Sequence, residues 1–276
     1  MRRLMLIDNG SSRAESTLSL RRLAAALEGR LGETVHPVSL LHSSRVSPAE
    51  LGGAPADTLE PFLECQVSAG HRDFLALPLF FGRGGALTGF LPEKLAAIRA
   101  RHGPFVFRLA DSLCPLPEGE PRLERILMDN IFQTARARGL TSYGIVLVDH
   151  GSPLPQVTRV RQVLAGRIRA LLGPGTTLWE AVMERREGRE YDFNGERLES
   201  LLRRLAAEDW ERPLILAMLF LSAGRHAGPG GDIEAICARV QADYPVFRAF
   251  PTPLAGSHPG LIDILESRCR SGGIGL

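Results

Sequence analysis

Two histidines and one glutamate follow buried-strand patterns in the second half of this 276-residue sequence. His150 comes directly after the apolar run GIVLVD, Glu184 follows TLWEAVM, and His226 lies a short loop after LILAMLFL. Because the carboxyl ends of parallel strands meet at one edge of a sheet, we expect these side chains to converge. Two imidazoles and one carboxylate leave coordination positions open, which suits a divalent ion such as Fe, Co, Ni or Zn. A single histidine at a strand end is more often solvated or hydrogen-bonded, so the prediction depends on all three.

Other reactive patterns in the sequence are weaker. Ser152 follows His150 closely, but the segment DHGSP lacks the first glycine of a G-x-S-x-G nucleophile turn. We expect Ser152 to cap the next helix or to support the loop. The glycines near residue 230 lack the spacing of a dinucleotide-binding loop, and no Lys-Ser/Thr follows them. The four cysteines form no C-x-x-C pair, which argues against a zinc ribbon or an iron–sulfur motif.

Self-similarity indicates how the site residues are positioned. Three segments recur: 4–12 as 145–153, 76–86 as 216–226, and 109–127 as 248–265. The offsets are 141 residues from Ser11 to Ser152, 140 from Leu79 to Leu219, and 138 from Pro121 to Pro259. Matches at a nearly constant offset predict two tandem copies of one unit. We therefore expect two domains, 1–138 and 139–276.

Each predicted copy alternates apolar runs with amphipathic stretches. The strands are predicted at 3–8, 35–41, 74–81 and 104–109, and again at 143–149, 177–183, 213–221 and 246–251. The spacing of leucines and alanines predicts a helix over 15–31. Continuous apolar strands between helices indicate parallel sheets that are covered on both faces. The expected fold is α/β, with two tandem homologous doubly wound domains, each on a four- or five-stranded, mainly parallel sheet. Residues 270–273 are expected to be a disordered tail.

Composition narrows the function classes. A hydrophobic content of 44% with 23% charged residues is ordinary for a soluble globular protein. The formal net charge of +2 argues against a nucleic-acid partner. The sequence has no 18-residue apolar span and no signal-peptide pattern, so we expect a cytoplasmic protein without membrane contact. Lys94 is the only lysine, whereas arginines that could grip carboxylates are plentiful.

The strand contexts of the two histidines resemble those of the CbiX-like sirohydrochlorin chelatases, which are class II tetrapyrrole metal chelatases. Glu184 aligns with a glutamate that follows a strand in that family, and residues 253–265 resemble its closing loop and helix. The resemblance covers both copies, as in the two-domain form of the family. The other matching residues are His150-Gly151-Ser152, Leu219-Phe220-Leu221, Gly224, His226 and Asp232-Ile233.

The resemblance implies insertion of Co²⁺ or Fe²⁺ into sirohydrochlorin or a related tetrapyrrole, in cobalamin or sirohaem biosynthesis. The metal is then a substrate, and no permanently bound cofactor is expected. His150, His226 and Glu184 would bind the metal and accept the pyrrole protons, with the division of these tasks left open.

Arginines are the expected partners of the tetrapyrrole carboxylates. Arg225 stands beside His226, Arg83 lies in the corresponding loop of the first copy, and Ser152 would lie at the substrate. Either arginine could equally be a solvated surface residue. Because the duplication supplies two domains in one chain, a monomer can suffice, and a homodimer stays open.

The first copy departs from this pattern. Asn9 stands where the second copy has His150, Ala86 stands where it has His226, and His42 is expected at the position of Glu184. We therefore predict one metal site, in the second copy.

Two changes near that site concern its ligands and its substrate. Arg225 stands where members of the family often have glycine, and the interval 227–231 makes the loop after His226 two residues longer than in the family. Both changes fall where the substrate is expected to enter, so they leave the substrate identity open. The charged stretch after Glu184 also offers Glu187, Glu190 or Asp192 as ligands.

Two alternatives to a chelatase follow. A carrier or sensor would bind metal or tetrapyrrole without catalysis. A metal-dependent hydrolase would need a general base beside the metal, and the sequence offers no clear one.

Overall fold

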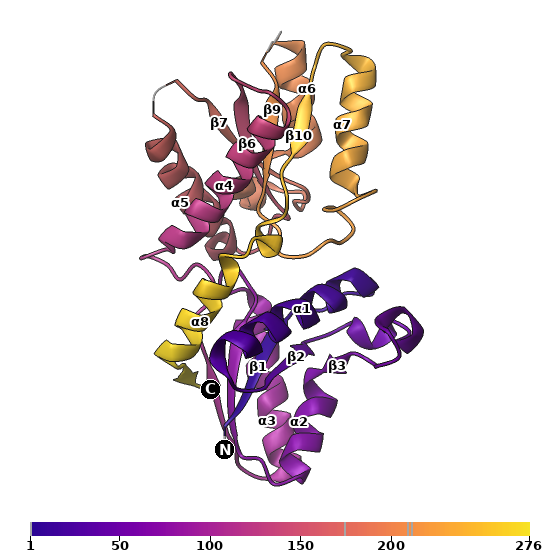
Figure 1. The fold of residues 1–276 in the computed structure, drawn as a ribbon, viewed down its shortest axis with the longest axis vertical. Coiled ribbons are helices and arrows are strands. Elements are labelled where there is room, and N and C mark those ends of the chain that lie inside the picture. The colour runs from indigo at the N-terminus through magenta and orange to yellow at the C-terminus, as the bar shows by residue number, and fades with distance from the viewer. Residues whose placement is uncertain (1, 174, 209, 211) are drawn as a thin grey trace. The chain divides into compact units, whose positions relative to one another are not determined.

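A computed structural model describes residues 2–173, 175–208, 210 and 212–276. The chain forms two compact units and crosses between them twice (Figure 1). Unit 1 comprises everything up to Glu118 together with Ile262–Leu276, and unit 2 comprises Gly119–Leu261.

Unit 1 is built on a six-stranded sheet in the order β11-β5-β4-β1-β2-β3. Its strands pair in parallel except for β11, which is antiparallel to β5. The strands are β1 (Arg3–Asp8), β2 (Val35–Ser39), β3 (Asp57–Thr58), β4 (Asp73–Pro78), β5 (Val106–Leu109) and β11 (Ile274–Gly275). The helices are α1 (Ala14–Leu31), α2 (Leu59–Ser68), α3 (Leu91–His102) and α8 (Leu261–Ser271).

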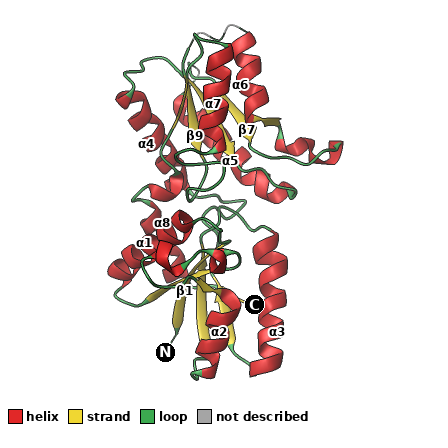
Figure 2. Ribbon diagram, turned by 90° about the vertical axis from the view of Figure 1, so that its right-hand side faces the viewer, coloured by secondary structure: helices red, strands yellow, loops and turns green. Residues whose placement is uncertain are grey.

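Unit 2 repeats this plan on a five-stranded parallel sheet in the order β10-β9-β6-β7-β8. In both units helices lie on both sides of the sheet (Figure 2). The strands are β6 (Gly144–Asp149), β7 (Leu178–Val182), β8 (Glu196–Arg197), β9 (Leu214–Met218) and β10 (Ala249–Pro251). The helices are α4 (Pro121–Ala137), α5 (Pro155–Leu172), α6 (Leu198–Ala207) and α7 (Asp232–Asp243).

The central strand of unit 2 explains why its sequence is apolar throughout. β6 is buried along its whole length, since strands flank it on both edges and helices cover both faces. One face of the sheet packs against leucines of α6 and against Ile233 and Val240 of α7. The carboxyl ends of β6, β7 and β9 therefore point to one edge, where the loops that follow them meet.

The predicted fold class is confirmed. All eight predicted strands and the helix over 15–31 are present, with ends that differ from the prediction by at most three residues. The two-residue strands β3, β8 and β11 were not predicted, because they are too short to give a periodic pattern. Among the described residues, every helix is too short or too polar to cross a membrane.

The compact units differ from the predicted halves 1–138 and 139–276 at both boundaries. α4 precedes the predicted boundary but packs against β9 and α5 of unit 2. α8 belongs to unit 1, where Asp263 and Glu266 form ion pairs with Arg30 of α1 (Figure 1, yellow beside indigo). The prediction of a disordered tail at 270–273 is wrong, because α8 extends to Ser271 and β11 then pairs with β5.

Candidate metal centre

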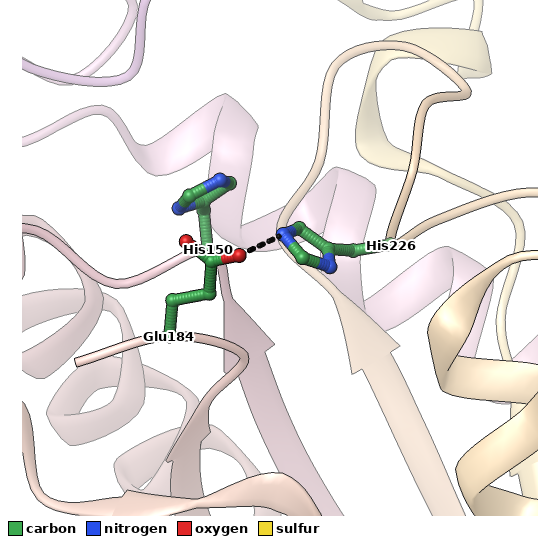
Figure 3. A group of neighbouring side chains, drawn as sticks. All are labelled: His150, Glu184 and His226. Carbon is green, nitrogen blue, oxygen red and sulfur yellow. Dashed lines mark ion pairs between the residues drawn. The ribbon is translucent and has the colours of Figure 1, made fainter.

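The three predicted ligands come from three different strand ends of unit 2. His150 directly follows β6, Glu184 follows β7 by two residues, and His226 lies in the loop between β9 and α7. The backbone N–H of Glu184 donates to the carbonyl oxygen of His150 at 2.9 Å, which holds the first two loops side by side. Figure 3 shows the three side chains meeting beyond the strands.

These side chains form an open group of metal-binding type. One ligand atom from each of the three lies within 4.8 Å of the others. Nε2 of His226 is 3.2 Å from Oε1 of Glu184, and the two imidazole centroids are 4.8 Å apart. The side chain of His226 is only 8% exposed, whereas Glu184 is 49% exposed and His150 is exposed as well. His226 thus forms the floor of a site that solvent or a substrate can enter.

Asp232 holds His226 from behind. Its Oδ2 lies 2.7 Å from Nδ1 of His226, and the backbone N–H of Ile233 donates to the carbonyl oxygen of His226. A carboxylate only accepts hydrogen bonds, so this contact places a ring proton on Nδ1, where it donates to Asp232. Nε2 then faces Glu184. In the sequence, Asp232 is visible only as part of the motif Asp232-Ile233 that follows His226, and nothing there predicts its contact with the imidazole.

A pocket of about 480 Å³ opens beside His226 and is rich in arginine. Its lining includes Glu184 and Asp232 together with four arginines, of which the sequence analysis named only Arg225. Arg225 is 73% exposed and makes two long contacts of 3.4 Å, to Glu184 and to Asp232. The other three arginines each pair with a nearby acid: Arg185 with Asp192, Arg197 with Glu187, and Arg239 with Glu199.

The remaining predicted residues lie as follows. Glu187 and Asp192 are held by the arginines just named, and neither they nor Glu190 join the group of His150. The hydroxyl oxygen of Ser152 accepts the backbone N–H of Leu154 at 3.1 Å, so Ser152 supports the loop before α5. Arg83 lies in unit 1 and forms an ion pair with Asp111 at 3.2 Å.

Unit 1 has other residues at the strand ends that correspond to the three candidate ligands. The backbone N–H of Leu41 donates to Asn9, as that of Glu184 donates to His150. A Cβ on Gly10 would overlap the carbonyl oxygen of Leu41, as one on Gly151 would overlap that of Glu184. The position of Glu184 is therefore taken by Leu41, and the assignment of His42 to it is wrong by one residue. The sequence alone misaligned His42 with Glu184, because the backbone hydrogen bonds that define the correspondence are seen only in the structure.

A buried aspartate ends the central strand of each sheet. In unit 2, burial raises the pKa of Asp149, while the guanidinium of Arg161 at 2.7 Å opposes this shift. In unit 1, burial raises the pKa of Asp8 to about 6. Oδ1 of Asp8 has no hydrogen-bonding partner among the described residues. The two copies therefore differ beneath the site as well as in it.

Comparison with known families identifies the unit that carries this group. Residues 144–271 match the sequence profile of the family described as CbiX. This part of the chain belongs to the CbiX family. The expected family is thereby confirmed over the segment that holds all three candidate ligands. No curated protein sequence matches the chain.

Solved structures show that the two-unit fold is that of chelatases. SirB from Bacillus subtilis with Fe³⁺ is 14% identical, with a TM-score of 0.72 over 98% of this chain and 94% of that one. The sirohydrochlorin chelatase SirB from B. subtilis subspecies spizizenii in complex with cobalt is 16% identical, with a TM-score of 0.65 and the same coverage. CbiX, described as the terminal enzyme for biosynthesis of siroheme in denitrifying bacteria, is 14% identical, with a TM-score of 0.59 over 98% and 99% of the two chains. At these identities the likeness shows the fold of the whole chain.

Proposed function

We propose that this protein inserts a divalent metal ion, Co²⁺ or Fe²⁺, into sirohydrochlorin or a related tetrapyrrole. The observation that carries the proposal is the convergence of His150, Glu184 and His226 at one sheet edge of a CbiX-family unit. Such a reaction belongs to the biosynthesis of cobalamin or of sirohaem, according to the metal. The fold relatives that carry Fe³⁺ or cobalt support a site of this kind.

The first requirement of the reaction is a site that holds the metal without enclosing it. Two ligands at about 2.1 Å from one tetrahedral ion lie about 3.4 Å apart. The distance of 3.2 Å between Nε2 of His226 and Oε1 of Glu184 fits this value. His150 needs only a small movement to become the third ligand, since its ligand atom lies within 4.8 Å of the other two. Three protein ligands leave positions open for the ring nitrogens.

The second requirement is the removal of two protons. As the metal ion bonds to the ring nitrogens, two pyrrole N–H bonds break and both protons leave. An imidazole has an ordinary pKa of about 6.5 and can accept a proton at neutral pH. His150 is the exposed imidazole of the group, and Glu184 offers a second accepting oxygen. Asp232 occupies Nδ1 of His226 and thereby keeps that ring oriented as a ligand.

The third requirement is recognition of a substrate that carries many carboxylates. The arginine-lined pocket next to His226 suits this substrate, since guanidinium groups form paired hydrogen bonds with carboxylates. Arg225 has the most exposed side chain of the proposed contacts and only long contacts of its own, so it is free to turn toward substrate. Arg83 and Ser152 remain predicted contacts of the substrate.

Absorbance spectroscopy of the tetrapyrrole tests this function. Purified protein is mixed with sirohydrochlorin and Co²⁺ or Fe²⁺, and the uncatalysed insertion rate is subtracted. We expect faster insertion with the wild type than with His150→Ala or His226→Ala, and an unchanged rate with the control His102→Ala in unit 1. Equal rates for the wild type and both site variants would contradict a chelatase. Tetrapyrrole binding without metal insertion would instead support the carrier or sensor.

A further inference from the structure

The loop that carries His150 is held by one buried amide. Asn194 ends the helical turn Arg189–Asn194 after β7, and its side chain is fully buried. Its Oδ1 accepts the backbone N–H of Ser152 at 3.1 Å, and its Nδ2 donates to the carbonyl oxygen of Ser152 at 2.8 Å. Oδ1 also accepts the hydroxyl of Thr158 at 3.0 Å. Both backbone polar groups of Ser152 are therefore fixed by one side chain.

Arg161 joins that amide to the other side of His150. This arginine is 2% exposed and extends from α5 under the loop. Its Nη1 lies 2.7 Å from Oδ1 of Asp149, and its Nη2 donates to the carbonyl oxygen of Asn194 at 2.6 Å. Oδ1 of Asp149 also accepts the backbone N–H of Gly151. The residues on both sides of His150 are thus tied into one buried network.

His150 itself has little direct support. Its Nδ1 makes one long contact of 3.3 Å, to the carbonyl oxygen of the adjacent Gly151. His226, by contrast, is held directly by Asp232. A metal-binding imidazole usually donates its other ring nitrogen to a group that fixes its orientation, and among the described residues the hydrogen-bonding partner of His150 is this backbone carbonyl. The network of Asp149, Arg161 and Asn194 supplies that rigidity.

Unit 1 shows the same strand end without the network. At the repeat offset of 141 residues, Thr17 corresponds to Thr158, and Leu20 corresponds to Arg161. The hydroxyl of Thr17 and Oδ1 of Asp8 are buried and have no hydrogen-bonding partner among the residues the structure describes. The backbone N–H of Ser11, which corresponds to Ser152, is held instead by the buried hydroxyl of Ser43 at 3.3 Å, and Ser43 donates to Ser39 at 2.8 Å. The copy that has histidine at the strand end thus fixes its loop with an amide and a guanidinium, whereas the copy that has Asn9 uses hydroxyls.

We propose that Asn194 and Arg161 are positioning residues that act on the metal through His150. The inference deepens the proposed function, since it depends on His150 being a ligand. It gives Asn194, in the charged stretch after Glu184, a role in holding the loop of His150.

A double-mutant cycle measured with Co²⁺ alone tests the positioning role. Substitution of residues that hold a metal ligand in place weakens metal affinity by about 10- to 100-fold, so we expect at least a tenfold loss for Asn194→Ala in isothermal titration calorimetry. If Asn194 acts through His150, the same substitution in a His150→Ala background costs no further affinity. An additional tenfold loss in that background would show that Asn194 merely stabilises unit 2, and would overturn the inference.

Two further measurements keep the outcome decisive. In the metal-free protein, the amide hydrogens of Gly151 and Ser152 should exchange slowly with solvent, and they should exchange faster after Asn194→Ala. Unchanged exchange would contradict the network.

Asn130→Ala is the matched control, because it removes another buried amide of unit 2, one that donates to Pro253. Its Co²⁺ affinity should equal that of the wild type. If Asn194→Ala does not fold, the isosteric Asn194→Asp replaces it in the cycle. A wild type that binds no Co²⁺ would overturn the metal site and this inference with it, whereas an additive cycle leaves the proposed function intact.

Discussion

The two units use one backbone plan and differ in the chemistry at its strand ends. Both have a buried aspartate at the end of the central strand, a left-handed glycine two residues later, and the same backbone hydrogen bonds to the next strand's loop. In unit 2 these elements present His150, Glu184 and His226, whereas in unit 1 they present Asn9, Leu41 and Ala86. The shared fold positions a site, but the side chains decide whether a site exists.

The pockets at these strand ends differ in the same way. In unit 1 a pocket of about 160 Å³ is lined largely by apolar side chains such as Leu40, Leu41 and Phe90, with one ion pair between Lys94 and Glu60. The pocket of unit 2 is about 480 Å³ and has four arginines in its lining. Of these two pockets, that of unit 2 has the arginines that a substrate with many carboxylates would need.

Giving unit 2 the residues of unit 1 should have the largest effect. The triple variant His150→Asn, Glu184→Leu and His226→Ala removes every proposed ligand, so Co²⁺ binding in unit 2 should be lost. Isothermal titration calorimetry measures this loss, with circular dichroism as the check on folding. Retained affinity in a folded triple variant would mean that the metal binds elsewhere.

The reverse exchange is the control. Asn9→His, Leu41→Glu and Ala86→His in unit 1 should create no second Co²⁺ site. Ala86 begins a short helical turn, whereas His226 lies in a loop where Asp232 orients its ring. Binding of two Co²⁺ ions per chain by this variant would show that the three ligand side chains suffice without the groups, such as Asp232, that orient them.

The next effect concerns the buried ion pair that unit 1 lacks. Arg161→Leu introduces the residue type of Leu20 and leaves Asp149 buried without its cation, which should cost about 3–5 kcal/mol of stability. Arg169→Leu on the same helix removes a 44%-exposed partner of Glu180 and should cost less than about 1 kcal/mol. Urea unfolding compares the two, and equal losses would contradict a special role for the buried pair.

A smaller effect on stability is expected at Asp8, the corresponding carboxyl of unit 1. Here it is the charged form of the wild-type side chain that destabilises the folded protein. Burial raises the pKa of Asp8 from 3.8 to about 6, so the folded protein binds this proton more tightly than the unfolded chain. Stability contributed by the protonated form is present below about pH 4 and is lost as the pH rises through about 6. Each pKa unit corresponds to about 1.4 kcal/mol, so the loss at neutral pH is about 2–3 kcal/mol.

Asp8→Asn should remove this dependence, as measured by urea unfolding between pH 4 and pH 7. The exposed Asp57→Asn in the same unit is the control and should leave the dependence as it is in the wild type. If Asp8→Asn changes stability equally at both pH values, the carboxyl of Asp8 does not titrate in this range.

The smallest effect concerns the feature that the units share. The hydroxyl oxygen of Ser11 accepts the N–H of Arg13, and that of Ser152 accepts the N–H of Leu154, both at 3.1 Å. Ser11→Ala and Ser152→Ala should each cost about 1 kcal/mol of stability. Neither should change Co²⁺ affinity. A selective loss of affinity with Ser152→Ala would give its hydroxyl a role at the metal.

The strands, and the convergence of the three candidate ligands, could be predicted because their signals are local. A parallel strand buried on both faces is a continuous apolar run, and His150 directly follows such a run. Glu184 follows β7, whose pattern is weaker because it contains the half-buried Glu180. The buried network of Arg161 and Asn194 was not predicted, because in the sequence these residues look like solvent-exposed polar side chains of a helix and a loop. The return of α8 and β11 to unit 1 was missed for a similar reason, since long-range pairing leaves little local pattern.

Anomalous X-ray diffraction from crystals soaked in Co²⁺ tests the central claim most directly. We predict one cobalt peak per chain, bonded to Nε2 of His226, to Glu184 and to His150, with none at Asn9, Leu41 and Ala86. A cobalt ion in unit 1, or an empty site at His226 with cobalt bound elsewhere, would contradict the assignment of the metal centre to unit 2.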